Sequence, residues 1–168
     1  MNLIHTSSMR IYHGQAAEWQ GAAAEVDLIL TNPYGPLPRV LYGRPMLIHQ
    51  WRHRQAEATL WCGNTLTEVA SWNGGREVFW CANMGKTPPA VDLSEFVPEP
   101  PGWYPLELPL RLLRAFGSPG ITVWDGFMGR GTVGRAARML GMHYIGVERL
   151  EKHLAIALDY LGVDHGVA

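Results

Sequence analysis

A glycine-rich turn near the C-terminal end constrains the fold of this chain more than any other feature. Residues 121–123 are a β-branched run that predicts a buried strand, and this strand ends on Asp125. The turn that follows contains Gly129-x-Gly131-x-x-Gly134. Apolar residues at helical spacing then predict a helix over 133–140, which Gly141 ends. A tight turn of this kind lets the backbone approach a ligand closely, and the helix N-terminus offers it unpaired N–H groups.

A second strand is predicted at 142–147, and it ends on Glu148. An acid in this place can accept both hydroxyls of a ribose. The spacing therefore fits a dinucleotide fingerprint, and it fits a nucleoside cofactor such as S-adenosylmethionine equally well. The alternative is a tight turn without a ligand, which the terminal acid disfavours. Too few residues follow Glu148 to complete a dinucleotide fold, unless the N-terminal part supplies the missing strands in permuted order.

Length and composition indicate a single globular domain over residues 1–168, with 47% hydrophobic and 17% charged residues. The sequence shows no apolar run of membrane-spanning length and no signal peptide, and its two cysteines are expected to be buried thiols. We therefore expect a cytoplasmic protein without a membrane partner. The net charge of −1 is unusual for a nucleic-acid binder, so any such binding must depend on a local patch.

The rest of the chain alternates between strand-like and helix-like segments, which predicts an α/β fold. We expect strands at 9–13, 26–31, 59–63 and 77–82, helices at 16–24, 66–72 and 110–116, and a long loop at 87–102.

One segment, 39–54, is rich in basic and aromatic residues. Two interpretations remain open: a solvated helix face, or a surface that contacts phosphates and stacks on bases. The basic residues are Arg39, Arg44, His49, Arg52, His53 and Arg54, with Tyr42 and Trp51 between them.

Three segments resemble motifs of the DNA methyltransferases that modify exocyclic amino groups. Residues 26–35, Val-Asp-Leu-Ile-Leu-Thr-Asn-Pro-Tyr-Gly, resemble their catalytic (Asp/Asn/Ser)-Pro-Pro-(aromatic) motif. Residues 125–132 resemble the cofactor motif Asp-Pro-Phe-x-Gly-x-Gly-Thr, and residues 104–109 resemble the His-Pro-x-x-Lys-Pro element before it. The catalytic motif comes first and the cofactor motif last, which is the permuted arrangement of the β class. The resemblance covers nearly the whole chain.

The chain departs from this family pattern at several positions. The catalytic motif has one proline, so either Asn32 fills its first position or Thr31 does, with Asn32 second. A separate target-recognition module is missing from the sequence. The remaining departures are Gly126 for the usual proline, Tyr104 and Leu108 for the usual His and Lys, and Gln15 where an Asp often contacts the adenine of the cofactor.

The resemblance implies a Rossmann-like methyltransferase fold: a mixed, mostly parallel sheet with helices on both faces, in circularly permuted order. It implies S-adenosylmethionine as the cofactor and no metal site. It assigns the catalytic role to Asn32, Pro33 and Tyr34, cofactor binding to Gln15, Asp125, Phe127, Met128, Gly129, Gly131, Thr132 and Glu148, and DNA binding to Arg39, Arg44, Arg52 and Arg54.

The implied activity is methylation of the exocyclic amino group of adenine, or of cytosine, in DNA. The Asn32 oxygen and the Pro33 carbonyl would accept the two amino hydrogens, and Tyr34 would stack on a flipped or single-stranded base. We favour adenine and low sequence specificity, as for an enzyme of a phage or mobile element, and a homodimer is a further possibility. The alternatives are a methyltransferase-fold binding module with weak or no catalysis and, ranked lowest, a nicotinamide-dependent enzyme.

Overall fold

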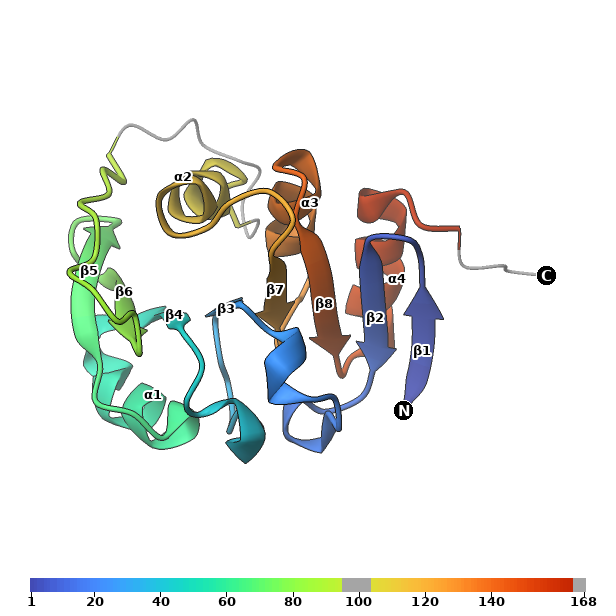
Figure 1. Ribbon diagram of the computed structural model, residues 1–168, viewed down its shortest axis with the longest axis horizontal. Helices are drawn as coiled ribbons and strands as arrows, with labels where there is room; N and C mark the ends of the chain where they lie inside the picture. Colours follow the sequence, from blue (N-terminus) through green and yellow to red (C-terminus); the bar gives the residue numbers. More distant parts are fainter. Residues whose placement is uncertain (95–103, 165–168) are drawn as a thin grey trace.

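The computed structural model describes residues 1–94 and 104–164, which form an eight-stranded sheet in the order β1-β2-β8-β7-β3-β4-β6-β5 (Figure 1). The strands are β1 (Asn2–His5), β2 (Met9–His13), β3 (Leu28–Thr31), β4 (Met46–Trp51), β5 (Thr67–Trp72), β6 (Glu77–Ala82), β7 (Thr122–Asp125) and β8 (His143–Glu148). The helices are α1 (Gln55–Cys62), α2 (Glu107–Phe116), α3 (Thr132–Met139) and α4 (Glu151–Leu161), with single 3₁₀ turns η1 (Ala16–Glu18), η2 (Ala23–Glu25), η3 (Arg39–Leu41) and η4 (Arg52–Arg54).

The centre of the sheet is parallel and its edges are antiparallel. Strands β2, β8, β7, β3 and β4 run in one direction, whereas β1 pairs antiparallel with β2, and β6 pairs antiparallel with β4 and β5. This arrangement confirms the expected mixed, mostly parallel sheet. It also places β3, from the first part of the chain, directly beside β7, from the last part.

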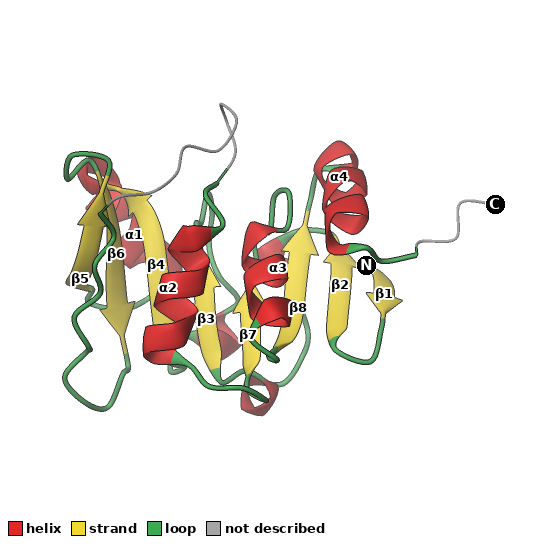
Figure 2. Ribbon diagram, turned by 90° about the horizontal axis from the view of Figure 1, so that it is seen from above, coloured by secondary structure: helices red, strands yellow, loops and turns green. Residues whose placement is uncertain are grey.

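Helices cover both faces of the sheet, as expected (Figure 2). One core lies under α2, α3 and α4, and includes Leu112, Ala136 and Leu158. The other core lies under α1 and the loops after β2 and β3, and includes Ala58 and Trp124. Residues 28–31 are buried on both sides, which explains why β3 is an almost continuous apolar run without alternation.

Two elements have a different secondary structure from the one predicted. Residues 59–63, expected to be a strand, lie largely in helix α1, because a short apolar run does not distinguish a strand from a helix. Only Ala58 and Cys62 of this helix are buried, and Leu60 is 76% exposed. Residues 66–72, expected to be a helix, form edge strand β5. A register shift between Glu68 and Ala70 interrupts its pairing with β6 and breaks the alternation that marks a strand.

The other differences concern shorter segments. The helix expected at 16–24 is two separate 3₁₀ turns, η1 and η2, with Gly21 between them. The segment 39–54 contains strand β4 between η3 and η4, so the interpretation as a helix face is wrong. Strand β1 and helix α4 were not expected. The loop expected at 87–102 is described only up to residue 94. Within the described ranges, no helix is long and apolar enough to cross a membrane.

Candidate active site

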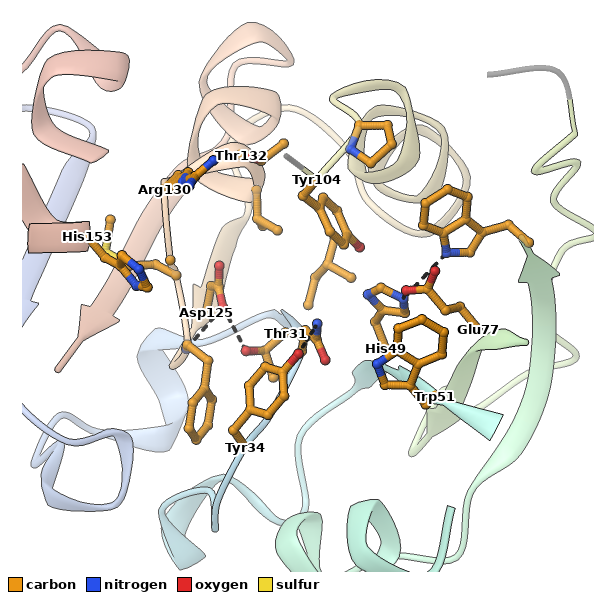
Figure 3. Close-up of a pocket in the computed structure, with 18 residues that line it drawn as sticks. Thr31, Tyr34, His49, Trp51, Glu77, Tyr104, Asp125, Arg130, Thr132 and His153 are labelled. Atoms are coloured by element: carbon orange, nitrogen blue, oxygen red, sulfur yellow. Dashed lines mark hydrogen bonds and ion pairs between the residues drawn. The ribbon is translucent and has the colours of Figure 1, made fainter. Parts of the chain in front are cut away.

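A pocket of about 610 Å³ opens at the carboxyl ends of β3, β4 and β7 and reaches the start of α3 (Figure 3). Ligands bind at this edge in open α/β sheets. The lining includes seven residues expected to act in catalysis or cofactor binding: Asn32, Tyr34, Asp125, Phe127, Met128, Gly129 and Thr132. It also includes residues to which the sequence analysis gave no role in catalysis or cofactor binding: His49, Trp51, Trp72, Glu77, Tyr104, Arg130 and His153.

Asp125 ends β7 with its carboxylate buried in a hydrogen-bond network. Its Oδ1 accepts hydrogen bonds from the Thr31 hydroxyl at 2.7 Å and the Phe127 backbone N–H at 3.2 Å, and its Oδ2 accepts one from the Tyr144 hydroxyl at 3.2 Å. Burial raises the pKa of Asp125 to about 6, although these three hydrogen bonds lower it. A cation nearby would therefore stabilise the charged form of this buried carboxylate.

Glu148 holds the glycine turn in place. Its Oε2 accepts a hydrogen bond from the Gly129 N–H at 2.9 Å, and its Oε1 accepts one from the Leu150 N–H at 2.7 Å. Gly131 caps α3 at φ +86°, a backbone conformation that other residues rarely adopt. Glu148 lies behind the pocket-lining Gly129, and each carboxylate oxygen keeps a lone pair for a further donor.

Asn32 follows β3 directly, and its side chain lines the pocket. The Oδ1 atom is buried and has no hydrogen-bond partner among the described residues, whereas Nδ2 lies 3.5 Å from the Tyr34 hydroxyl. Tyr34 is 60% exposed, so its ring is available to a ligand at the mouth of the pocket (Figure 3). The Thr31 hydroxyl, the other candidate for the first position of the catalytic motif, donates a hydrogen bond to Asp125. An unpaired buried acceptor costs free energy until a ligand donor satisfies it.

The Pro33 carbonyl, in contrast, already has a partner. The Gln50 side-chain Nε2 donates to it at 2.7 Å, and the Gln50 side-chain Oε1 accepts from the Trp51 N–H at 2.9 Å. Gln50 is almost completely buried on β4. It therefore fixes the turn after β3, a contact that no sequence motif signalled.

A cluster around His49 forms the wall of the pocket towards β6. The His49 ring stacks on Phe79 at 4.4 Å between centroids, and Tyr104 lies 5.2 Å away. Its Nε2 lies 3.0 Å from a Glu77 carboxylate oxygen. Burial acts to raise the pKa of Glu77, but hydrogen bonds from His49 and Asn73 and the charge of Arg76 outweigh it and lower this pKa. Long-range pairing of β4 with β6 brings these residues together, so sequence spacing could not reveal the cluster.

The four arginines expected to bind DNA lie outside the pocket lining. Arg44 donates from Nε to the Val26 carbonyl at 2.7 Å, so it supports the fold. Arg52 pairs with both Glu68 oxygens at 2.9 Å, and Arg54 lies 3.9 Å from Glu57. Arg39 is exposed on η3.

Gln15 and Gly131 also lie outside the lining. Gln15 follows β2, which pairs with β8 so that His13 lies opposite Glu148. Gln15 is exposed at the same edge of the sheet as the pocket.

Residues 48–159 match the model of a DNA methylase family, N6_N4_Mtase. A 53-residue segment is 38% identical to the type II methyltransferase M.HinfI from Haemophilus influenzae and spans 32% of this chain and 15% of that protein. The fold is similar to that of TTHA0409 from Thermus thermophilus, with a TM-score of 0.67 and 18% identity over 94% of this chain and 96% of that chain. It is also similar to M1.HpyAVI in complex with SAM, with a TM-score of 0.61 and 19% identity over 92% of this chain and 100% of that chain. A third similar structure is the cytosine-N4-specific PvuII DNA methyltransferase, with a TM-score of 0.64 and 13% identity over 97% of this chain and 89% of that chain.

Proposed function

The chain belongs to the N6/N4 DNA methylase family, whose cofactor is S-adenosylmethionine, and from this premise we propose that it methylates an exocyclic amino group of DNA bases. The observation that carries the proposal is the buried, unpartnered Asn32 Oδ1, in the same pocket as Asp125. An amino group is a donor that would satisfy this oxygen.

The glycine-turn half of the pocket fits the cofactor. Its sulfonium and ammonium groups are cationic, and the buried Asp125 carboxylate, with its raised pKa, gains from a cation nearby. Glu148 and Gln15, at the same sheet edge, would bind the ribose and the adenine. We propose the cofactor-binding set Gln15, Asp125, Phe127, Met128, Gly129, Gly131, Thr132 and Glu148.

The β3 half of the pocket fits the target base. An exocyclic amino group is a poor nucleophile because its lone pair is delocalised into the ring. Hydrogen bonding to Asn32 Oδ1 favours a nitrogen with a localised lone pair, which can attack the methyl group that the cofactor supplies. Tyr34 would stack on the base, which has to leave a duplex to reach the pocket.

Adenine is our preferred target and cytosine is the alternative. We also propose low sequence specificity, because no separate recognition module interrupts the single sheet of the described residues. Methyl transfer from labelled S-adenosylmethionine to unmethylated DNA, followed by analysis of the product nucleosides, tests both points. N6-methyladenine spread over many sequence contexts is the expected product. N4-methylcytosine, or one fixed context, would correct the corresponding part of the proposal.

A second candidate is a binding module that keeps this fold but transfers no methyl group. The Pro33 carbonyl favours it, because it was expected to accept an amino hydrogen but already accepts from Gln50, which leaves one lone pair for a further donor. Calorimetry with S-adenosylmethionine, together with the transfer assay, separates the two candidates. Cofactor binding without transfer to any DNA would support the binding module.

A further inference from the structure

The pairing of β3 with β4 places Asn32 beside His49. These strands are parallel, with Thr31 opposite Ile48, so the next residue on each strand occupies adjacent positions. Side chains alternate between the two faces of a sheet, and neighbours in register share a face. Leu30 and Leu47, two residues before Asn32 and His49, both face the core under α2 and α3. Asn32 and His49 therefore follow on that face, and both line the pocket.

Glu77 determines which nitrogen of His49 carries hydrogen. Its carboxylate, which has a lowered pKa, can only accept, so His49 Nε2 donates to it over 3.0 Å. The Trp72 indole N–H points to the same Nε2 atom at 3.4 Å, which would need Nε2 as an acceptor. The shorter contact to the charged Glu77 carboxylate outweighs it and keeps the hydrogen on Nε2. In neutral His49 the Nδ1 atom is then an acceptor.

This Nδ1 atom is buried, and none of residues 1–94 and 104–164 gives it a hydrogen-bond partner. His49 is only 1% exposed, and in Figure 3 its ring lies between Glu77 and the interior of the pocket, below Tyr104. The pocket thus holds two buried acceptors without a donor, Asn32 Oδ1 and His49 Nδ1, on neighbouring strands. The Pro33 carbonyl, in contrast, already accepts a hydrogen bond from Gln50 and has one lone pair left.

We propose that His49 is a second catalytic residue, which accepts the other hydrogen of the target amino group and then takes its proton. This inference rests on the proposed function. An exocyclic amino group has two N–H donors, which match the two acceptors. The amino nitrogen forms a bond to the methyl carbon while the carbon–sulfur bond breaks, and that bonding pair stays on sulfur. The nitrogen then loses one proton to His49 Nδ1, and Glu77 stabilises the resulting imidazolium.

The first test compares single-turnover rates of methyl transfer to unmethylated DNA. His49→Phe keeps the ring stacked on Phe79 but removes the nitrogen, and we expect a rate loss of ~10²-fold or more. Affinity for S-adenosylmethionine should change little. Glu77→Gln should show a smaller loss. His143→Phe is the matched control, because His143 is exposed and lies outside this pocket.

A wild-type protein that transfers no methyl group would overturn the proposed function and this inference with it. An active wild type and an equally active His49→Phe variant would overturn the inference alone.

The second test needs neither activity nor a variant, and so remains decisive if His49→Phe does not fold. Nitrogen NMR of the histidine-labelled wild type reports which ring nitrogen carries hydrogen. In neutral His49 we expect the hydrogen on Nε2 and none on Nδ1. A hydrogen on Nδ1 of neutral His49 would overturn the proposal, because that atom could not accept from the amino group.

Discussion

Thr31 and Asn32 are neighbours in the chain, but their side chains serve different partners. The Thr31 hydroxyl donates to the buried Asp125, whereas the Asn32 oxygen lies in the pocket without a partner. Thr31 and Asn32 could each fill the first position of the catalytic motif, and Asn32 is the one whose buried side-chain oxygen has no partner among the described residues. This supports Asn32 as the residue that binds the target amino group.

The raised pKa of Asp125 predicts a pH dependence of stability. The folded pKa is about 6, above the ordinary value of 3.8, so between these values the folded state binds a proton that the unfolded state releases. Stability therefore falls as pH rises from about 4 to about 6, by up to ~3 kcal/mol for a shift of about two units. Denaturant unfolding of the wild type and Asp125→Asn across this range measures the effect.

The Asn variant cannot titrate and serves as the reference. The free energy of unfolding of the wild type, relative to this variant, should decline with rising pH. A constant difference would show that Asp125 is not shifted upwards.

At the scale of elements, secondary structure was predicted best where nearby residues alone determine it. The glycine turn with β7, α3 and β8 lies close to its predicted place, because turn chemistry and apolar spacing are both encoded within a few residues. Helix α1 was predicted as a strand and strand β5 as a helix, because their secondary structure depends on packing against β4 and β6. The His49–Glu77 cluster was missed for the same reason, since it arises from pairing between strands.

Gly126 illustrates a local departure with a structural cause. The family usually has proline here, but any Cβ at this position would collide with the Trp124 ring and lie 3.0 Å from the Ala16 side chain. Both neighbours are buried. We therefore expect Gly126→Ala to lower the free energy of unfolding by ~1–3 kcal/mol through overpacking.

Thermal or denaturant unfolding measures this loss against Gly43→Ala, where an added Cβ meets no atom within 4 Å. Equal stability of the two variants would mean that the loop moves freely away from Trp124.

At the scale of the whole molecule, the sheet joins two turns from opposite ends of the sequence. β3 and β7 are neighbours, so Asn32 and Asp125 line one pocket although more than ninety positions separate them. The order of the motifs along the chain predicted this arrangement only through the resemblance. Which arginines are available to a ligand was harder to predict, because an arginine-rich sequence does not show which side chains are already paired within the fold, as Arg44 and Arg52 are.

Salt dependence tests whether the basic segment contacts DNA. Each lost phosphate contact should reduce the slope of log affinity against log salt by about 0.9 for duplex DNA. Arg52 and Arg54 are exposed enough to exchange their carboxylate partners for phosphates, so replacing both with Ala should flatten the slope. Arg114→Ala, on α2 outside the segment, is the control. An unchanged slope in the double variant would exclude both residues from the DNA interface.

The most direct test of the account is the rate of methyl transfer to DNA by the wild type and by Asn32→Ala, measured beside their affinities for S-adenosylmethionine. The wild type should methylate DNA amino groups. The variant should bind the cofactor almost as well, because the proposal assigns Asn32 to the base and not to the cofactor. Its rate should fall by ~10²-fold or more, as for other preorganised polar groups. A variant that transfers methyl groups at the wild-type rate, or a wild type that binds the cofactor and methylates no DNA, would contradict the account.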